Sequence, residues 1–267
     1  MSKKNLFCLI IISLLACSCT RKVAIDESST RKAAIDESRL VEINLDTNNV
    51  KPFDKEDSKK RAEAEEDLSK TLVTFDIYTD SVINIFNELK RNNFKLNNVG
   101  CYAARNIRNG KTKSLHAYAS AIDVNSRQNP YINIWATPIL IIPKPEDMQE
   151  EIKNKDYYLK RNIIRPGMIT EKEAEIFYKN GFTQWGGSTV WRGCPDYMHF
   201  QTSLAIAKIV TQLPKYQARI FWNKYLQDPK KIILDPFFNQ DIDDKDIEFK
   251  SVMKRIDKIL KVNKQIL

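Results

Sequence analysis

The sequence predicts an α+β fold, in which a few short strands are combined with amphipathic helices. Short runs rich in β-branched and aromatic residues, at positions 121–124, 132–135 and 189–191, are typical of strands. Capping residues followed by apolar side chains at helical spacing occur on both sides of these runs. Once the amino-terminal residues are set aside, roughly 200 residues remain, which is enough for one domain with a sizeable core.

Residues 1–16 resemble a bacterial lipoprotein signal peptide. Lys3 and Lys4 precede an apolar run of about eleven residues, which is too short to span a bilayer as a helix. Cys17 follows Leu-Leu-Ala and is the expected lipidation site, with Cys19 as the second choice. We therefore expect a lipid-anchored protein of the bacterial cell envelope that faces the periplasm or the wall. A plain cleaved secretion signal and an uncleaved anchor are the alternatives.

Residues 17–60 are predicted to form a polar tether. Residues 20–28 are nearly repeated by residues 30–38 as a ten-residue duplication, and two copies are too few to build a solenoid. The segment is charged and almost free of aromatic side chains, which favours a solvated spacer. The folded domain is then expected over residues 61–235.

The chain is basic, with a formal net charge of +9. Losing Lys3 and Lys4 with the signal peptide leaves 9 minus 2, or +7. Such a charge attracts anionic lipid headgroups or wall carboxylates. We expect no nucleic-acid partner, because the lysines are scattered among acidic residues and the chain is expected to be exported. We also expect a monomer.

Two helices are predicted before the last third of the chain. Asp80 can cap a helix over residues 82–89. Thr170 and Glu173 form a capping-box pattern that opens a helix ending at Gly181.

Further helices are predicted over residues 203–213 and 216–226, separated by Pro214. Residues 236–267 are predicted to be an amphipathic helical extension, because apolar side chains recur there at helical spacing among lysines. We expect this extension to pack on the domain. The alternative is a helix that binds a partner or a membrane.

The chain contains only two histidines, His116 and His199, and each lies in a short polar motif. Asp123 follows the first histidine by seven positions, and Asp196 precedes the second by three. A catalytic zinc ion takes three protein ligands from His, Asp or Glu and leaves one position open for water. The candidate ligands are therefore His116, Asp123 and His199, although an isolated histidine more often lies at the surface or in the core.

The spacing of the first motif requires a turn. Asp123 lies in the strand-like run 121–124, where an acidic residue is disfavoured and needs a partner. Seven is an odd offset, so a straight strand would point His116 and Asp123 to opposite faces. Residues 117–120 are the expected turn that lets both bind one ion.

Together these motifs resemble the zinc D-alanyl-D-alanine peptidases, a family that includes VanY-like D,D-carboxypeptidases and phage L-alanyl-D-glutamate endopeptidases. The resemblance covers roughly residues 75–205, and several motifs in one order are more specific than any one alone. The matching segments are Ser-x-His-x6-Asp at 114–123, Trp-Gly-Gly at 185–187, Asp-x-x-His-Phe at 196–200, an arginine segment at 100–105, Asn-Pro-Tyr at 129–131 and a connector at 165–169.

The resemblance implies a zinc peptidase domain over residues 61–235. A small antiparallel sheet would carry the zinc site, helices would flank it, and a C-terminal helix would be added. The resemblance further implies that His116, Asp123 and His199 bind Zn²⁺ and that Asp196 is the catalytic carboxylate. A carboxylate there can take a proton from water and return it to the leaving amine. The alternative for Asp196 is a cap or turn residue.

Two further residues gain expected roles from the resemblance. Arg105 matches the family arginine that holds a peptide carboxylate or stabilises the oxyanion, which suits a charged guanidinium that forks onto two oxygens. Its alternative is a solvated arginine. Ser114 matches the serine two residues before the first histidine and is expected to donate a hydrogen bond to substrate or ligand.

Three positions depart from the family pattern. Ala119 stands where glycine is usual, Ser188 replaces a common aspartate, and Gln201 stands where an acidic residue is common. Since the ligands are retained, these changes concern substrate preference and pocket shape more than metal binding.

Cys101 and Cys194 lead to a separate hypothesis, a disulfide formed in an oxidising envelope. It would tie the arginine segment to the loop before Asp196. A Cys194 thiolate ligand for zinc is disfavoured, because two histidines and one aspartate already complete a site.

The sequence therefore predicts a metallopeptidase, a zinc-dependent D-alanyl-D-alanine carboxypeptidase that trims peptidoglycan stem peptides by metal-activated water. An L-alanyl-D-glutamate or cross-bridge endopeptidase is the enzymatic alternative, because the ligands are shared and loop shape sets selectivity. The other alternative is a non-catalytic lipoprotein that binds a wall peptide on the same fold.

Overall fold

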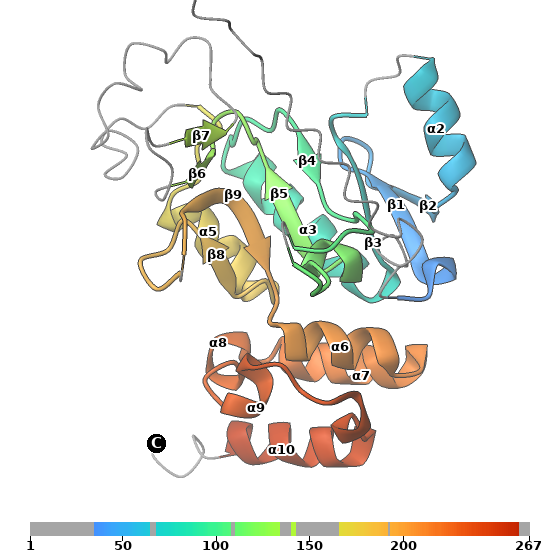
Figure 1. The fold of residues 1–267 in the computed structure, drawn as a ribbon, viewed down its shortest axis with the longest axis vertical. Coiled ribbons are helices and arrows are strands. Elements are labelled where there is room, and N and C mark those ends of the chain that lie inside the picture. The colour runs from blue at the N-terminus through green and yellow to red at the C-terminus, as the bar shows by residue number, and fades with distance from the viewer. Residues whose placement is uncertain are drawn as a thin grey trace, which may run out of the picture.

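The computed structural model describes residues 35–64, 68–107, 110–133, 140–142, 166–191 and 193–261. The predicted signal peptide over residues 1–16, the lipidation site at Cys17 and most of the duplication lie outside the described residues. Two antiparallel sheets stand above a layer of helices (Figure 1). The described elements thus confirm the predicted α+β class.

The first sheet is formed by residues that the sequence suggested were a tether. Its strands are β1 (Leu40–Asn44), β2 (Asn49–Pro52) and β3 (Thr71–Phe75), in the order β2-β1-β3. A short turn of helix, η1 (Glu37–Arg39), precedes β1, and α2 (Lys55–Glu63) follows β2. The tether prediction is therefore wrong over residues 36–60.

The physical reason lies in the few apolar residues of this segment. The side chains of Leu40, Ile43 and Leu45 are buried, so a mostly polar stretch still supplies one face of a sheet. The charge of Glu42 is buried as well, and it is neutralised by Arg61 of α2 at 2.6 Å and Lys51 of β2 at 3.4 Å. Polar composition alone concealed this packing.

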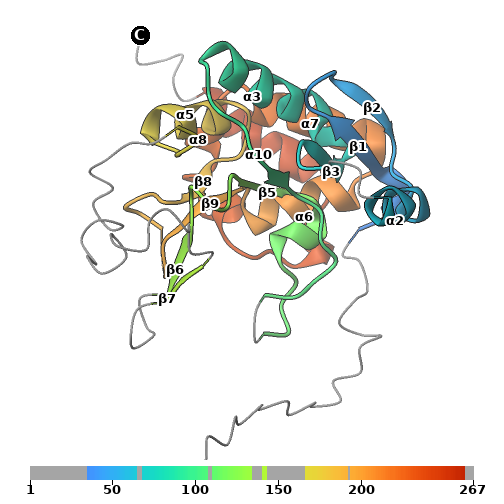
Figure 2. The same cartoon turned by 90° about the horizontal axis from the view of Figure 1, so that it is seen from above.

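The second sheet carries the predicted metal ligands. Its strand order is β4-β5-β9-β6-β7, with β8 also paired to β9, and all of the pairings are antiparallel. In Figures 1 and 2, β6 and β7 project away from the helices. The strands are β4 (Val99–Gly100), β5 (Ala121–Val124), β6 (Tyr131–Asn133), β7 (Leu140–Ile142), β8 (Gln184–Gly186) and β9 (Asp196–Gln201).

Two of the three predicted strands are present. The strand predicted over 121–124 is β5, and that over 132–135 overlaps β6, with residues 134–135 outside the described residues. The strand predicted over 189–191 is wrong, because the chain leaves the sheet after Gly186 and makes turns. Val190 is 84% exposed there, so its β-branched side chain has no neighbouring strand on which to pack.

The helices agree closely with the capping signals. The predicted capping box of Thr170 and Glu173 is formed, and Gly181 follows its helix with φ of 93°. Asp80 lies in the first turn of its helix rather than at the cap, which is Tyr78. The helices of the second and third quarters are η2 (Asp76–Tyr78), α3 (Thr79–Arg91), η3 (Leu115–Tyr118) and α5 (Glu171–Lys179).

Residues 204–261 form the helical layer below the sheets (Figure 1). In α10, Val252 and Ile256 are buried, and the helix contacts α7 and α8. The predicted extension thus packs on the domain over its described part. None of the described helices is both long enough and apolar enough to cross a bilayer. The elements are α6 (Leu204–Gln212), α7 (Lys215–Tyr225), α8 (Pro229–Ile232), α9 (Pro236–Asn239), η6 (Asp244–Asp246) and α10 (Phe249–Lys261).

The core fixes the register of β9. The ring of Phe200 stacks on Phe177 of α5 with centroids 3.7 Å apart, and on Trp185 of β8 with centroids 6.0 Å apart. Because successive side chains of a strand point to opposite faces, burying Phe200 in the core turns His199 to the other face. Packing of Phe200 on one face of the sheet therefore positions His199 on the other face.

Candidate metal centre

The pairing of β5 with β9 brings two of the predicted ligands together. Asp123 and His199 are directly opposite each other in the register. The Asp123 Oδ1 atom lies 2.9 Å from His199 Nδ1. A contact across 76 positions of sequence is thus set by ordinary antiparallel pairing.

His116 reaches the same place through a tight turn. The turn consists of η3, capped by the Ser114 hydroxyl, which accepts a hydrogen bond from the His116 backbone at 3.3 Å. Ala119 ends it with φ of 49° in the left-handed region, where glycine is favoured. The turn places His116 Nε2 3.3 Å from Asp123 Oδ2. The predicted turn between the two residues is confirmed.

The hydrogen bond on the other ring nitrogen of His116 sets its tautomer. Nδ1 lies 2.5 Å from the backbone carbonyl oxygen of Cys101. A carbonyl oxygen only accepts, so Nδ1 carries the hydrogen and Nε2 keeps a lone pair. Nε2 is buried and lacks a hydrogen-bond partner among the described residues. A buried, unpaired lone pair of this kind fits a metal ligand.

The three ligand atoms form a set suited to zinc. One nitrogen from each histidine and one oxygen from Asp123 all lie within 4.8 Å of one another. Ligands about 2 Å from a tetrahedral zinc ion lie roughly 3.3 Å apart, so small side-chain movements close the set around an ion. Two nitrogens and one carboxylate oxygen leave a fourth position open. The residues present therefore fit the metal that the motifs predicted.

Charge within the set is arranged to favour an ionised Asp123. Burial alone would raise the pKa of Asp123, but the close contacts of its carboxylate with the rings of His116 and His199 outweigh burial and lower the pKa well below its usual value. Burial lowers the pKa of His199, but the hydrogen bond and charge of Asp123 raise it by more. The pKa of His199 therefore lies above its usual value. A metal ion that binds here would release a proton from His199.

Asp196 begins β9 and lies beside this group without being part of it. Burial raises the pKa of Asp196 to about 6, and the charge of Asp123 adds to the rise, whereas His199, His116 and Arg105 oppose it. Its Oδ1 atom is buried and lacks a hydrogen-bond partner within the described part of the chain. A carboxyl group of this kind can take up or release a proton near neutral pH.

The Trp-Gly-Gly motif has a steric explanation at Asp196. A Cβ atom on Gly186 would lie 2.2 Å from the Asp196 carbonyl oxygen and 2.8 Å from its Cβ. A Cβ atom on Gly187 would lie 2.4 Å from the Trp185 ring and 2.5 Å from the Tyr197 ring. Only glycine lets this segment approach β9 so closely, so the motif allows β8 to lie directly against Asp196.

Arg105 and Ser114 occupy different environments. The Arg105 side chain is exposed and close enough for its charge to act on Asp196. The Ser114 hydroxyl is buried and caps η3, a structural role that sequence reasoning missed. The roles toward substrate that were expected of both remain predictions.

Two neighbours of His199 were not predicted as part of the site. The Trp191 ring lies edge-on to the imidazole, with centroids 5.8 Å apart. Gln201 Oε1 lies 2.8 Å from His199 Nε2. Period-two alternation along β9 puts Gln201 on the same face as His199, so the strand pattern alone could have revealed it. Trp191 lies in a turn, and no local signal indicates it.

The hypothetical disulfide is contradicted. Cys101 and Cys194 are both free. The Cys101 thiol donates to the Ala119 carbonyl at 3.4 Å, and the Cys194 thiol donates to Asn133 Oδ1 at 3.7 Å. Cys101 follows β4, whereas Asn133 belongs to β6, and β5 and β9 separate these strands. Burial also raises the pKa of the Cys101 thiol to about 12, so this sulfur is a packed core atom.

The two asparagines near the sheet explain other shared motifs. The Asn129 amide donates to the Gly167 carbonyl at 2.9 Å, and its oxygen accepts from the Ile169 backbone at 2.7 Å. The Asn125 amide oxygen accepts from the backbone of Asn97 at 2.7 Å. The Asn-Pro-Tyr segment and the connector after residue 165 are therefore bonded to each other, which holds the far end of β5 in place.

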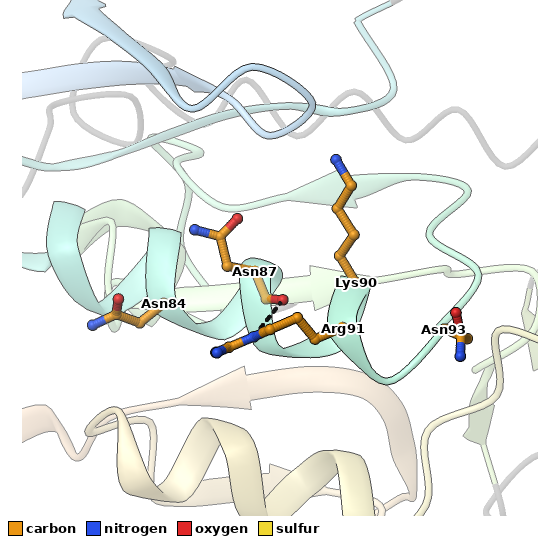
Figure 3. A pocket seen from close by; sticks show the side chains of 5 residues that line it. All are labelled: Asn84, Asn87, Lys90, Arg91 and Asn93. Atoms are coloured by element: carbon orange, nitrogen blue, oxygen red, sulfur yellow. Dashed lines mark hydrogen bonds between the residues drawn. The ribbon is translucent and has the colours of Figure 1, made fainter.

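A separate hollow lies on α3 (Figure 3). The Arg91 Nε donates to the Asn87 backbone carbonyl at 3.4 Å. The residues that line this hollow are not part of the metal group, and none of them carries a carboxylate or an imidazole. The hollow is lined by Asn84, Asn87, Lys90, Arg91 and Asn93.

Comparison with known proteins identifies the segment that carries this geometry. Residues 108–202 match a protein family described as D-alanyl-D-alanine carboxypeptidase. This segment contains His116, Asp123, Asp196 and His199, and the match confirms the family that the motifs predicted. No curated protein and no solved structure matches the chain. The site therefore lies within a segment that is similar to peptidases of this family.

Proposed function

Because residues 108–202 match the D-alanyl-D-alanine carboxypeptidase family, we propose that this protein is a zinc-dependent D,D-carboxypeptidase that removes the terminal D-alanine of peptidoglycan stem peptides. The observation that carries the proposal is the His116–Asp123–His199 group, whose ligand atoms lie within 4.8 Å of one another, beside the carboxyl group of Asp196. That combination is what hydrolysis of a peptide bond by water requires.

The protein's own side chains have distinct tasks in this proposal. His116 Nε2, a carboxylate oxygen of Asp123 and His199 Nδ1 would hold the ion. Zinc, when bound, would lower the pKa of a water molecule and polarise the scissile carbonyl group. Asp196, whose pKa is raised to about 6, accepts a proton from the attacking water through its unpaired Oδ1. It then returns that proton to the leaving amine.

Arg105 supports the choice of a carboxypeptidase. A substrate that ends in D-alanine has a free carboxylate, which a guanidinium can hold with two parallel hydrogen bonds. Arg105 is exposed and acts electrostatically on Asp196, so a carboxylate bound there would lie near the scissile bond. We therefore assign Arg105 to recognition of the terminal carboxylate.

The proposed place of action rests on the amino-terminal sequence. We propose that Cys17 is lipidated and that the enzyme is anchored to a membrane of the bacterial envelope, where its substrate is found. The layout of residues 1–17 supports this.

The proposal is tested by mass spectrometry of a defined pentapeptide after incubation with the chain from residue 20 onward. Zinc-dependent loss of one alanine, abolished by a chelator, is the expected result. An internal cut would identify an endopeptidase instead. An intact peptide beside stoichiometric bound zinc would identify a binding protein.

The variant Asp196→Asn tests the assignment of the base. It preserves size and removes proton transfer, so we expect activity to fall by roughly 10²–10⁴-fold with zinc retained. Asp46→Asn, at an aspartate whose side chain is 60% exposed in the turn between β1 and β2, is the matched control and should retain full activity. Full activity in Asp196→Asn would remove Asp196 from the mechanism.

A further inference from the structure

His199 has a polar partner on each ring nitrogen. Nδ1 faces Asp123 Oδ1 at 2.9 Å, and Nε2 faces Gln201 Oε1 at 2.8 Å. Only one of these nitrogens can be a metal ligand while the other carries a hydrogen. The metal chemistry therefore depends on which nitrogen is left with the lone pair.

The Gln201 amide is itself held in one orientation. Its Nε2 donates to Gln184 Oε1 at 2.6 Å, and the Gln184 Nε2 donates to Asn239 Oδ1 at 3.4 Å. Gln201 and Gln184 are paired directly across β9 and β8, so their side chains lie side by side on one face. All the donors in this chain of amides point the same way, from His199 toward α9.

The direction of these hydrogen bonds decides the state of the imidazole. An amide oxygen only accepts, so His199 Nε2 must carry the hydrogen, and the neutral ring keeps its lone pair on Nδ1. Nδ1 is the nitrogen that faces Asp123. If the Gln201 amide alone were reversed, its oxygen would lie against the oxygen of Gln184, and its NH₂ group would require the lone pair of His199 to be on Nε2. The pairing with Gln184 opposes this reversal.

We propose that Gln201, held by Gln184 and Asn239, is a positioning residue that selects Nδ1 of His199 as the coordinating nitrogen. This inference rests on the proposed zinc function. Asn239 lies on α9, outside the family-matched segment 108–202. Through α9, the C-terminal helical layer thereby contributes to the metal affinity of the site.

The first test measures zinc affinity by competition with a chromophoric chelator. We expect Gln201→Leu to weaken zinc binding roughly 10- to 100-fold, because outer partners of metal-ligating histidines have effects of this size. Gln201→Glu should restore near-wild-type affinity, since a carboxylate also only accepts. Asn239→Ala should have a smaller effect in the same direction. Gln227→Leu, at an exposed glutamine on the helical layer, is the matched control.

The second test identifies the coordinating nitrogen. The chain has only two histidines, so a nitrogen-15 correlation spectrum of the zinc-loaded protein contains two imidazole patterns. We expect His116 bound through Nε2 and His199 through Nδ1 in the wild type, and a loss of the single Nδ1 pattern in Gln201→Leu. A merely structural role of Gln201 would leave this pattern unchanged.

The outcomes separate the two proposals. A wild-type chain that binds no zinc would overturn the proposed function and this inference with it. A wild-type chain that binds zinc, together with a Gln201→Leu variant of equal affinity and unchanged Nδ1 coordination, would overturn this inference alone.

Discussion

The two histidines of the metal group are supported in different ways. His116 stands on a tight turn, and its outer nitrogen bonds to a backbone carbonyl, that of Cys101. His199 stands on a strand, and its outer nitrogen bonds to a side chain, that of Gln201. Backbone support depends on the fold, whereas side-chain support can be changed by one substitution. The turn half of the site, with His116, therefore has a support that no side-chain substitution removes directly, whereas the strand half, with Asp196 and His199, has a support that one substitution can remove.

The largest effect is expected from removing either histidine ligand. His116→Ala should lose stoichiometric zinc, because three protein ligands are the least that a catalytic site uses. His199→Ala should lose zinc to the same extent, because both histidines are proposed ligands and differ only in the group that bonds to the outer ring nitrogen. Metal content after gel filtration measures this. Unchanged zinc in either variant would contradict the ligand assignment.

The strand half also contains Asp196, whose raised pKa predicts a pH effect on the stability of the zinc-free protein. Burial raises the pKa of Asp196 from 3.8 to about 6, so the folded state binds the proton more tightly than the unfolded state. The resulting stability is fully present below about pH 4 and is lost as pH rises through about 6, by at most about 3 kcal/mol.

Asp196→Asn removes this titration. The free energy of unfolding, measured by denaturant titration from pH 4 to 7, should decline more for the wild type than for the variant. Parallel curves for the two proteins would show that Asp196 has an ordinary pKa in the folded state.

A smaller effect is expected from adding a methyl group between β8 and β9. Gly186→Ala places a Cβ atom 2.2 Å from the Asp196 carbonyl oxygen, so β8 and β9 must separate. We expect a loss of about 1–3 kcal/mol in unfolding free energy, with activity reduced further because Asp196 moves. Gly110→Ala is a control for the added methyl group, since a Cβ atom there would make only ordinary contacts, the shortest being 3.5 Å to the Ile107 carbonyl oxygen. Equal activity loss in both variants would argue against a specific role for the close approach.

The smallest effect is expected at the support of His116. Cys101→Ala retains the backbone carbonyl that bonds to His116 Nδ1, so zinc affinity should stay within about twofold of the wild type, compared with the larger loss for Gln201→Leu. Chelator competition on the two variants in parallel compares the supports directly. A large loss of zinc in Cys101→Ala would show that the turn half is as sensitive to side chains as the strand half.

Much of the site could be predicted from local pattern. The odd offset between His116 and Asp123 required a turn, and the capping box at Thr170 and the strand at 121–124 were both found where expected. These features depend on residues close in sequence, where period and capping chemistry are informative. The errors came where distant partners decide. The apolar residues of β1 were too few to reveal a strand, and no pattern shows that residues 189–191 lack a neighbouring strand.

The sequence by itself, through its motifs and their resemblance to a known family, indicated the candidate zinc ligands and the candidate proton-transferring carboxyl group, because motifs depend on residue type and order. Only the tertiary structure decided which nitrogen of each imidazole faces Asp123, that Cys101 and Cys194 stay apart, and that Gln184 and Asn239 are linked to His199 through Gln201. The physical reason is that a tautomer, a disulfide and a hydrogen-bond chain each depend on atoms brought together from distant segments. Strand pairing and packing of the core establish those distances.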